Sequence, residues 1–84
     1  MEIIIDCTGL ECARQLHLKL KEALSFPEWY GCNLDALYDC LTEISGQTRL
    51  ILIHFRSLPF PVCGFDAVLT DAQKKNPDLT VEIR

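Results

Sequence analysis

Two aspartates one helical turn apart are the residues in this chain whose type and spacing could do chemistry. Asp35 and Asp39 follow Asn33, a good N-cap residue, so the sequence predicts both carboxylates on one face of the helix that Asn33 begins. Paired carboxylates can serve as general acid and general base, as they do in glycosidases. Alternatively, they can bind cations on a partner, best the guanidinium group of arginine in bidentate geometry.

The helix carries a charge repulsion that its own folding does not need, and this favours the cation-binding alternative. The helix dipole favours Asp35 in the first turn, but Asp39 lies beyond that turn and repels Asp35 at a cost of ~0.2–0.5 kcal/mol. Glu43 extends the acidic row, and no Lys or Arg within the helix offsets it. The simplest alternative is a solvated acidic face. Because both aspartates project outward and no closed cleft is indicated, we expect no enzyme activity.

An aromatic loop leads directly into the acidic helix and contains Pro27, Trp29, Tyr30 and Gly31. Aromatic residues in a loop are either packed beneath it or presented to a partner, and Trp and Tyr often anchor interfaces. We expect Gly31 to adopt a positive φ just before the N-cap. Carboxylates beside flat aromatic rings resemble the phosphates and bases of nucleic acid. The expected complement is therefore the cationic surface of a nucleic-acid-binding protein.

The remaining elements are expected to support this segment. Hydrophobic periodicity predicts the order strand, helix, helix, strand, helix, strand, at residues 2–6, 11–24, 34–44, 50–55, 65–75 and 79–83. Helical crossovers favour parallel pairing, so the sequence predicts a single α/β domain over residues 1–84 with a small three-stranded parallel sheet and about three helices. The 50–55 strand, the most apolar, should be central.

Local signals add four smaller expectations. The run Ile3-Ile4-Ile5 predicts a first strand buried on both faces. Gly46 is expected as the C′ residue of the second helix. Two prolines exclude a helix of normal length at residues 56–61. His17, alone within the first helix, is expected to be structural.

Composition limits the classes of function. The 84 residues carry a formal charge of −4, which argues against direct nucleic-acid binding and suits a basic protein partner. No apolar run approaches a membrane span and the N-terminus does not resemble a signal peptide, so we expect a cytoplasmic protein. Self-repulsion favours a monomer when the chain is free. No cofactor motif is present, and the five cysteines lack metal-ligand spacing and are expected to be reduced thiols.

The segment FPEWYGCNLDALYDCLTE closely resembles the signature of the barstar family, intracellular inhibitors of secreted bacterial guanyl-specific ribonucleases. That signature has a proline, aromatics and a glycine, then Asn-Leu-Asp-Ala-Leu, an aromatic and an aspartate. The resemblance implies a parallel-sheet fold and an inhibitor that occupies the basic active site of a ribonuclease in place of RNA. The partner-binding residues that it implies are Asp35, Asp39, Trp29, Gly31, Asn33, Tyr38, Thr42 and, on the third helix, Asp71.

This chain departs from the family pattern at several positions. Trp29 and Tyr38 stand in the reverse order to the aromatics of the founding inhibitor, Ile44 replaces a tryptophan, and Cys32 replaces a more usual polar residue. The stretch at residues 56–64 is shorter and proline-rich, so one family helix is expected to be missing. A second hypothesis therefore remains open: a protein-interaction module or an immunity protein for a toxin that is not a ribonuclease.

Overall fold

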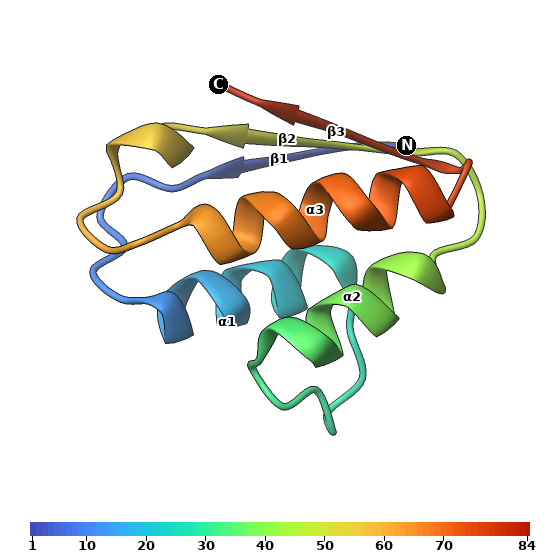
Figure 1. The fold of residues 1–84 in the computed structure, drawn as a ribbon, viewed down its shortest axis with the longest axis horizontal. Coiled ribbons are helices and arrows are strands. Elements are labelled where there is room, and N and C mark those ends of the chain that lie inside the picture. Colours follow the sequence, from blue (N-terminus) through green and yellow to red (C-terminus); the bar gives the residue numbers. More distant parts are fainter.

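Three parallel strands form one sheet in the computed structural model, which describes residues 1–84, and the helices pack beneath it (Figure 1). The strand order is β1-β2-β3, and both pairs of neighbours are parallel. This confirms the predicted α/β class and the predicted element order. The elements are β1 (Glu2–Asp6), α1 (Ala13–Leu24), α2 (Leu34–Thr42), β2 (Thr48–Ile53), the 3-10 helix η1 (Phe55–Ser57), α3 (Cys63–Lys75) and β3 (Leu79–Ile83).

The central strand is β2, as its apolar sequence predicts. Its register places Ile51 between Ile4 of β1 and Glu82 of β3. The strand begins and ends two residues earlier than residues 50–55, because His54 takes a left-handed φ of 62° and turns the chain into η1. The predicted absence of a normal helix after this point is confirmed, since η1 spans only three residues and the prolines follow it.

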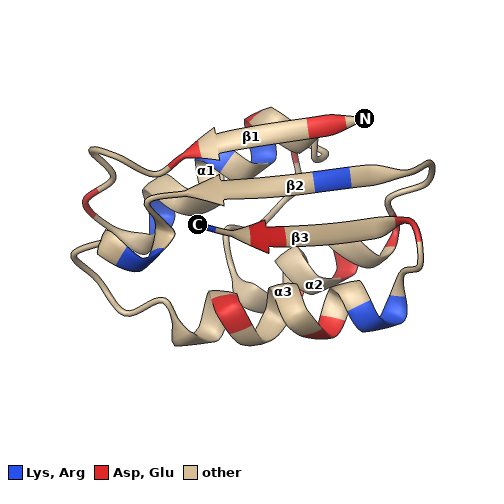
Figure 2. Ribbon diagram, turned by 90° about the horizontal axis from the view of Figure 1, so that it is seen from above, with Lys and Arg blue, Asp and Glu red and all other residues tan.

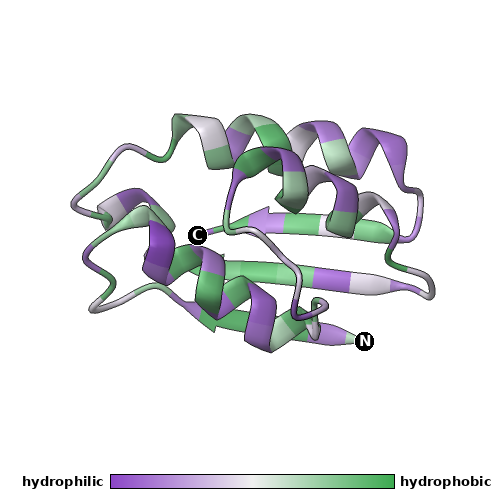
Figure 3. Cartoon of the chain, turned by 90° about the horizontal axis from the view of Figure 1, so that it is seen from below, coloured by the Kyte–Doolittle hydropathy of each residue, from purple (hydrophilic) through white to green (hydrophobic).

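Only one face of the sheet is covered, because α1, α2 and α3 all lie on the same side (Figure 1). Alternate strand residues such as Ile5, Leu50 and Leu52 point into this core and are at most 2% exposed. Apolar and polar residues alternate along the helices (Figure 3), and the apolar ones, such as Leu16, Leu37 and Leu69, belong to the same core. The prediction that β1 is buried on both faces is wrong: Ile4 points to the uncovered face and is 57% exposed.

The uncovered face carries a chain of ion pairs across the three strands. Figure 2 marks the positions of charged residues along these strands. Arg49 of β2 pairs with Glu2 of β1 at 3.4 Å and with Glu82 of β3. Arg84 also pairs with Glu82. Exposed pairs of this kind contribute little stability each, but they give this face its polar cover.

The ends of the three helices differ from the bounds that the sequence predicts. The first helix starts two residues later than predicted, at Ala13, and α3 starts two residues earlier, at Cys63. The second helix ends at Thr42, so Gly46 is not its C′ residue; with a φ of 84° it lies instead in the turn to β2. All five cysteines are free thiols, and no helix has the length and apolar character that crossing a membrane requires.

Candidate protein-binding surface

The start of α2 is held by a side-chain cap. The Asn33 Oδ1 atom accepts a hydrogen bond from the backbone N–H of Ala36 at 2.8 Å, as the sequence predicts for this N-cap. The expectation of a positive φ at Gly31 is wrong, because the left-handed residue is Cys32, with a φ of 51°. Gly31 is needed for space: a Cβ there would lie 2.9 Å from the Asn33 Nδ2 atom.

Burial of one side of α2 determines where its carboxylates point. Leu37 and Leu41 are fully buried beneath the helix, while Asp35 and Asp39 are exposed on the other side. At the N-terminal end of α3, Gly64 permits close packing, since a Cβ there would lie 2.7 Å from Leu34 Cδ1. The two aspartates thus project from a helix that is firmly seated on α3.

The end of α2 is held by a buried amide that the sequence interpretation missed. The Nδ2 group of Asn76 donates to the carbonyl oxygens of Leu41 at 3.0 Å and Ile44 at 2.9 Å. The Leu41 carbonyl also accepts the backbone N–H of Ile44 at 3.4 Å, so Asn76 joins the last turn of α2 to the residue that follows the helix. Asn76 stands directly before a proline, and nothing local in the sequence distinguishes it from a residue that merely stops α3.

The two neighbouring aromatics of the loop have opposite environments. Trp29 is 68% exposed, whereas Tyr30 is buried against the ring of Phe26. The Tyr30 hydroxyl lies 2.6 Å from Nδ1 of His17, whose ring also packs on Phe65 with 4.7 Å between centroids. Burial raises the pKa of Tyr30 and lowers the pKa of His17, so the pair is uncharged at neutral pH. Tyr30 therefore fixes the loop, and Trp29 is its exposed aromatic.

The carboxylates of this region have no cation partner within the molecule. Glu28, Asp35, Asp39 and Glu43 form no ion pair, although acids elsewhere, such as Glu82, do. No Lys or Arg occurs between residues 21 and 49. The loop and α2 consequently present uncompensated negative charge, which is attractive to a cationic surface.

The other predicted residues lie at the edge of this surface. Tyr38 is half-buried and lines a shallow hollow of about 410 Å³ together with Asp71, Lys74 and Lys75, so α2 and α3 bring Tyr38 and Asp71 together. The hydroxyl of Thr42 donates to the Asp39 carbonyl oxygen at 3.0 Å, and its side chain is half-buried. Their roles in partner binding remain predictions.

The region that builds this surface also carries the similarity to known proteins. A family model described as Barstar (barnase inhibitor) matches residues 1–61, which include the loop and all of α2. A protein of Bacillus subtilis (strain 168) named "Putative ribonuclease inhibitor YrdF" is 56% identical over 85 residues, covering 99% of this chain and 93% of that protein. The chain therefore belongs to the barstar family, a family of inhibitor proteins rather than enzymes.

Proposed function

We propose that this protein inhibits a basic ribonuclease by covering the nuclease active site with α2 and the loop at residues 26–33. Membership of the barstar family and the name of the Bacillus subtilis relative support an inhibitor of this kind. The resemblance of the loop and helix to the family signature points to the microbial, guanyl-specific class of ribonuclease. The protein would act in the cytoplasm and be monomeric when free.

The observation that carries this proposal is the combination of unpaired carboxylates and one exposed indole. Asp35 and Asp39 are exposed and have no intramolecular cation partner, and Trp29 is 68% exposed on the loop that leads into their helix. A nuclease active site must hold phosphate oxygens with Arg, Lys or His side chains. The two carboxylates would take the place of the phosphates, and Trp29 would lie against the catalytic histidine. Blockade of this kind needs no chemistry by the inhibitor.

Inhibition assays with matched variants test the proposal. Wild-type protein is titrated against a panel of microbial guanyl-specific ribonucleases and should inhibit at least one stoichiometrically. Asp39→Ala should weaken binding by roughly 2–5 kcal/mol, or at least about thirtyfold, because a desolvated cation on the nuclease would lose its partner. Glu11→Ala is the control, since it removes the same charge from an exposed position outside α2 and the loop.

The outcomes also distinguish the nature of the partner. If folded wild-type protein inhibits no nuclease of the panel, capture of a co-expressed toxin without ribonuclease activity would favour the alternative of an immunity protein. If Asp39→Ala and Glu11→Ala inhibit equally well, the assignment of Asp39 is wrong.

A further inference from the structure

The two edge strands of the sheet are protected unequally. At the β3 edge, the backbone N–H of Val81 donates to the Gln73 side-chain oxygen of α3 at 2.6 Å. The helix thus satisfies a donor that would otherwise be open to another strand. This arrangement is one way in which proteins prevent unwanted pairing at a sheet edge.

The β1 edge has no such cover. The Met1 carbonyl accepts from the N–H of Arg49, and the Cys7 N–H donates to the carbonyl of Ile53. Because hydrogen bonding in a parallel ladder involves every second residue of a strand, the N–H and C=O groups of the odd-numbered residues of β1 point toward β2. The N–H and C=O groups of Glu2, Ile4 and Asp6 therefore point away from the sheet, and no side chain hydrogen bonds to them.

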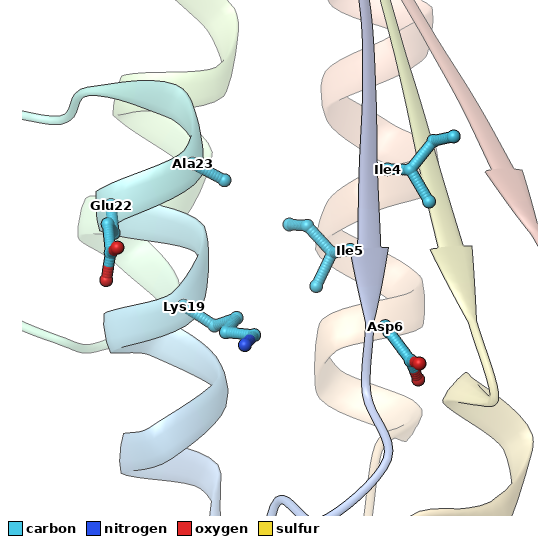
Figure 4. Close-up of a pocket in the computed structure, with 6 residues that line it drawn as sticks. All are labelled: Ile4, Ile5, Asp6, Lys19, Glu22 and Ala23. Atoms are coloured by element: carbon cyan, nitrogen blue, oxygen red, sulfur yellow. The ribbon is translucent and has the colours of Figure 1, made fainter.

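A groove of about 430 Å³ runs beside this open edge, between β1 and α1 (Figure 4). Ile5 of β1 and Ala23 of α1 point toward each other across it, and Lys19 extends from α1 toward the strand (Figure 4). Asp6 and Glu22 also line it, so the groove is part apolar and part charged. A free strand edge with open space beside it is the arrangement that accepts an extended peptide by strand addition, where main-chain hydrogen bonds give affinity and alternate side chains give specificity.

We propose that β1 is a second binding site, which accepts an extended segment of a partner protein. In that segment an apolar residue has one Lys or Arg two residues before it and another two residues after it. Such a segment would become a fourth strand. Its apolar residue would lie opposite the exposed Ile4, and its basic residues would lie opposite the exposed carboxylates of Glu2 and Asp6.

The charges beside β1 support this occupant over a second copy of the chain. Antiparallel pairing of two β1 strands about Ile4 would place Glu2 opposite Asp6 of the other copy, and like charges directly opposite are destabilising. On the helix side, Lys19 offsets Glu22. Arg49 pairs with Glu2 and Glu82, and Arg84 also pairs with Glu82, so these four residues are neutral together. Asp6 forms no ion pair, and its carboxylate is the one at this edge that stays free for a basic residue.

The β1 site is separate from the surface proposed to bind the nuclease. The sheet lies on one side of the molecule, while α2 and its loop lie on the opposite side (Figure 1). The edge could therefore be occupied while the nuclease is bound, and its test does not depend on the inhibitor function.

Titration of the ¹⁵N-labelled full chain with a synthetic peptide tests the proposal. The probe is a capped heptapeptide of threonines with lysine at its second and sixth positions and isoleucine at its fourth. Saturable amide shifts should be centred on β1, and the amides of Glu2, Ile4 and Asp6 should become slower to exchange with solvent. A peptide with glutamates in place of the lysines should not bind. Shifts spread over α2, or equal binding of both peptides, would overturn the proposal.

A variant of the strand separates main-chain pairing from simple charge attraction. Ile4→Pro removes one outward N–H at an edge position where proline is tolerated, and it should weaken peptide binding by about fivefold to tenfold. Ile4→Thr keeps the N–H and loses only part of the apolar cross-strand contact, so it should weaken peptide binding by less than about threefold, clearly less than Ile4→Pro. Unchanged affinity of a folded Ile4→Pro variant, or a concentration-dependent dimer that competes with the peptide in sedimentation, would refute this occupant. If Ile4→Pro does not fold, the exchange protection of wild-type amides decides the question alone.

Discussion

The Nδ1 atom of His17 lies 2.6 Å from the hydroxyl oxygen of Tyr30, and this buried contact joins α1 to the loop that precedes α2. His17 is 4% exposed and Tyr30 is 5% exposed, so neither polar group has ready access to water. The contact places Tyr30 beneath the loop and leaves its neighbour Trp29 outside. The shape of the proposed inhibitory surface therefore depends on a pair of residues that would not touch the nuclease.

Removing the hydroxyl of Tyr30 should destabilise the protein. Tyr30→Phe keeps the ring contact with Phe26 but leaves His17 without its buried partner, which should cost about 1–3 kcal/mol of unfolding free energy. Urea denaturation measures this loss. Tyr38→Phe is the matched control, because the half-buried Tyr38 hydroxyl makes no hydrogen bond within the protein and its loss should change stability by less than ~0.5 kcal/mol. Equal losses in the two variants would show that the buried contact contributes nothing.

Stability should fall in mildly acidic solution because of His17. Burial lowers the folded-state pKa of His17, whereas the unfolded chain has the ordinary value of about 6.5. Below that value the unfolded state binds more protons than the folded state, so stability decreases as the pH falls through about 6.5 and onward toward the folded-state pKa. Above about pH 7.5, His17 should contribute no pH dependence.

Denaturation midpoints measured between pH 5 and pH 8 check this expectation. His17→Gln should flatten the decline, while His54→Asn should keep it, because His54 is exposed and asparagine tolerates its left-handed backbone. Asp6 cannot account for the decline, since hydrogen bonds from Thr8 lower the pKa of this carboxyl and its contribution is lost only near pH 4 and below. A decline that persists in His17→Gln would assign the effect to other groups.

Trp29 should matter for binding and not for folding. Because its side chain is 68% exposed, Trp29→Ala should change the unfolding free energy by no more than ~0.5 kcal/mol. Inhibition should weaken by about 2 kcal/mol or more, as expected for an aromatic anchor at an interface. Leu18→Ala, an exposed apolar position on α1, serves as the control and should inhibit normally.

The same residue provides a direct signal of complex formation. Trp29 is the only tryptophan, so the emission of the free protein should be that of a solvated indole and should shift to shorter wavelength when a tryptophan-free nuclease variant binds. Absence of a shift in an inhibited complex would show that Trp29 stays outside the interface.

Gly31 and Asn33 should be energetically coupled. Asn33→Ala should cost about 1 kcal/mol because the helix loses its cap. Gly31→Ala should cost a comparable amount, since the new Cβ would displace the Asn33 side chain, 2.9 Å away, from its capping position. Denaturation of the double variant should therefore show a loss clearly smaller than the sum. Strict additivity would mean that Gly31 acts through something other than the cap.

Local signals in the sequence determined much of this protein. The strands were predicted at residues 2–6 and 79–83, the bounds that the structure has, because the turn and proline signals that end them are local. Asn33 was identified as the cap and the α2 aspartates as outward-facing, since capping and helical period depend only on residues a few positions apart. The family signature lies in the same short segment.

Only the tertiary structure decided which side chains are covered. Trp29 and Tyr30 are adjacent and similar, yet Tyr30 is held by His17 of α1, whose ring in turn packs on Phe65 of α3, far away in the sequence. Ile4 is exposed because all three helices lie on one side of the sheet, and right-handed crossovers place them there only when the strand order is β1-β2-β3, which no local pattern encodes. Whether a side chain is buried depends on which other residues surround it after folding. For this reason the loop anchor and the open strand edge became visible only in three dimensions.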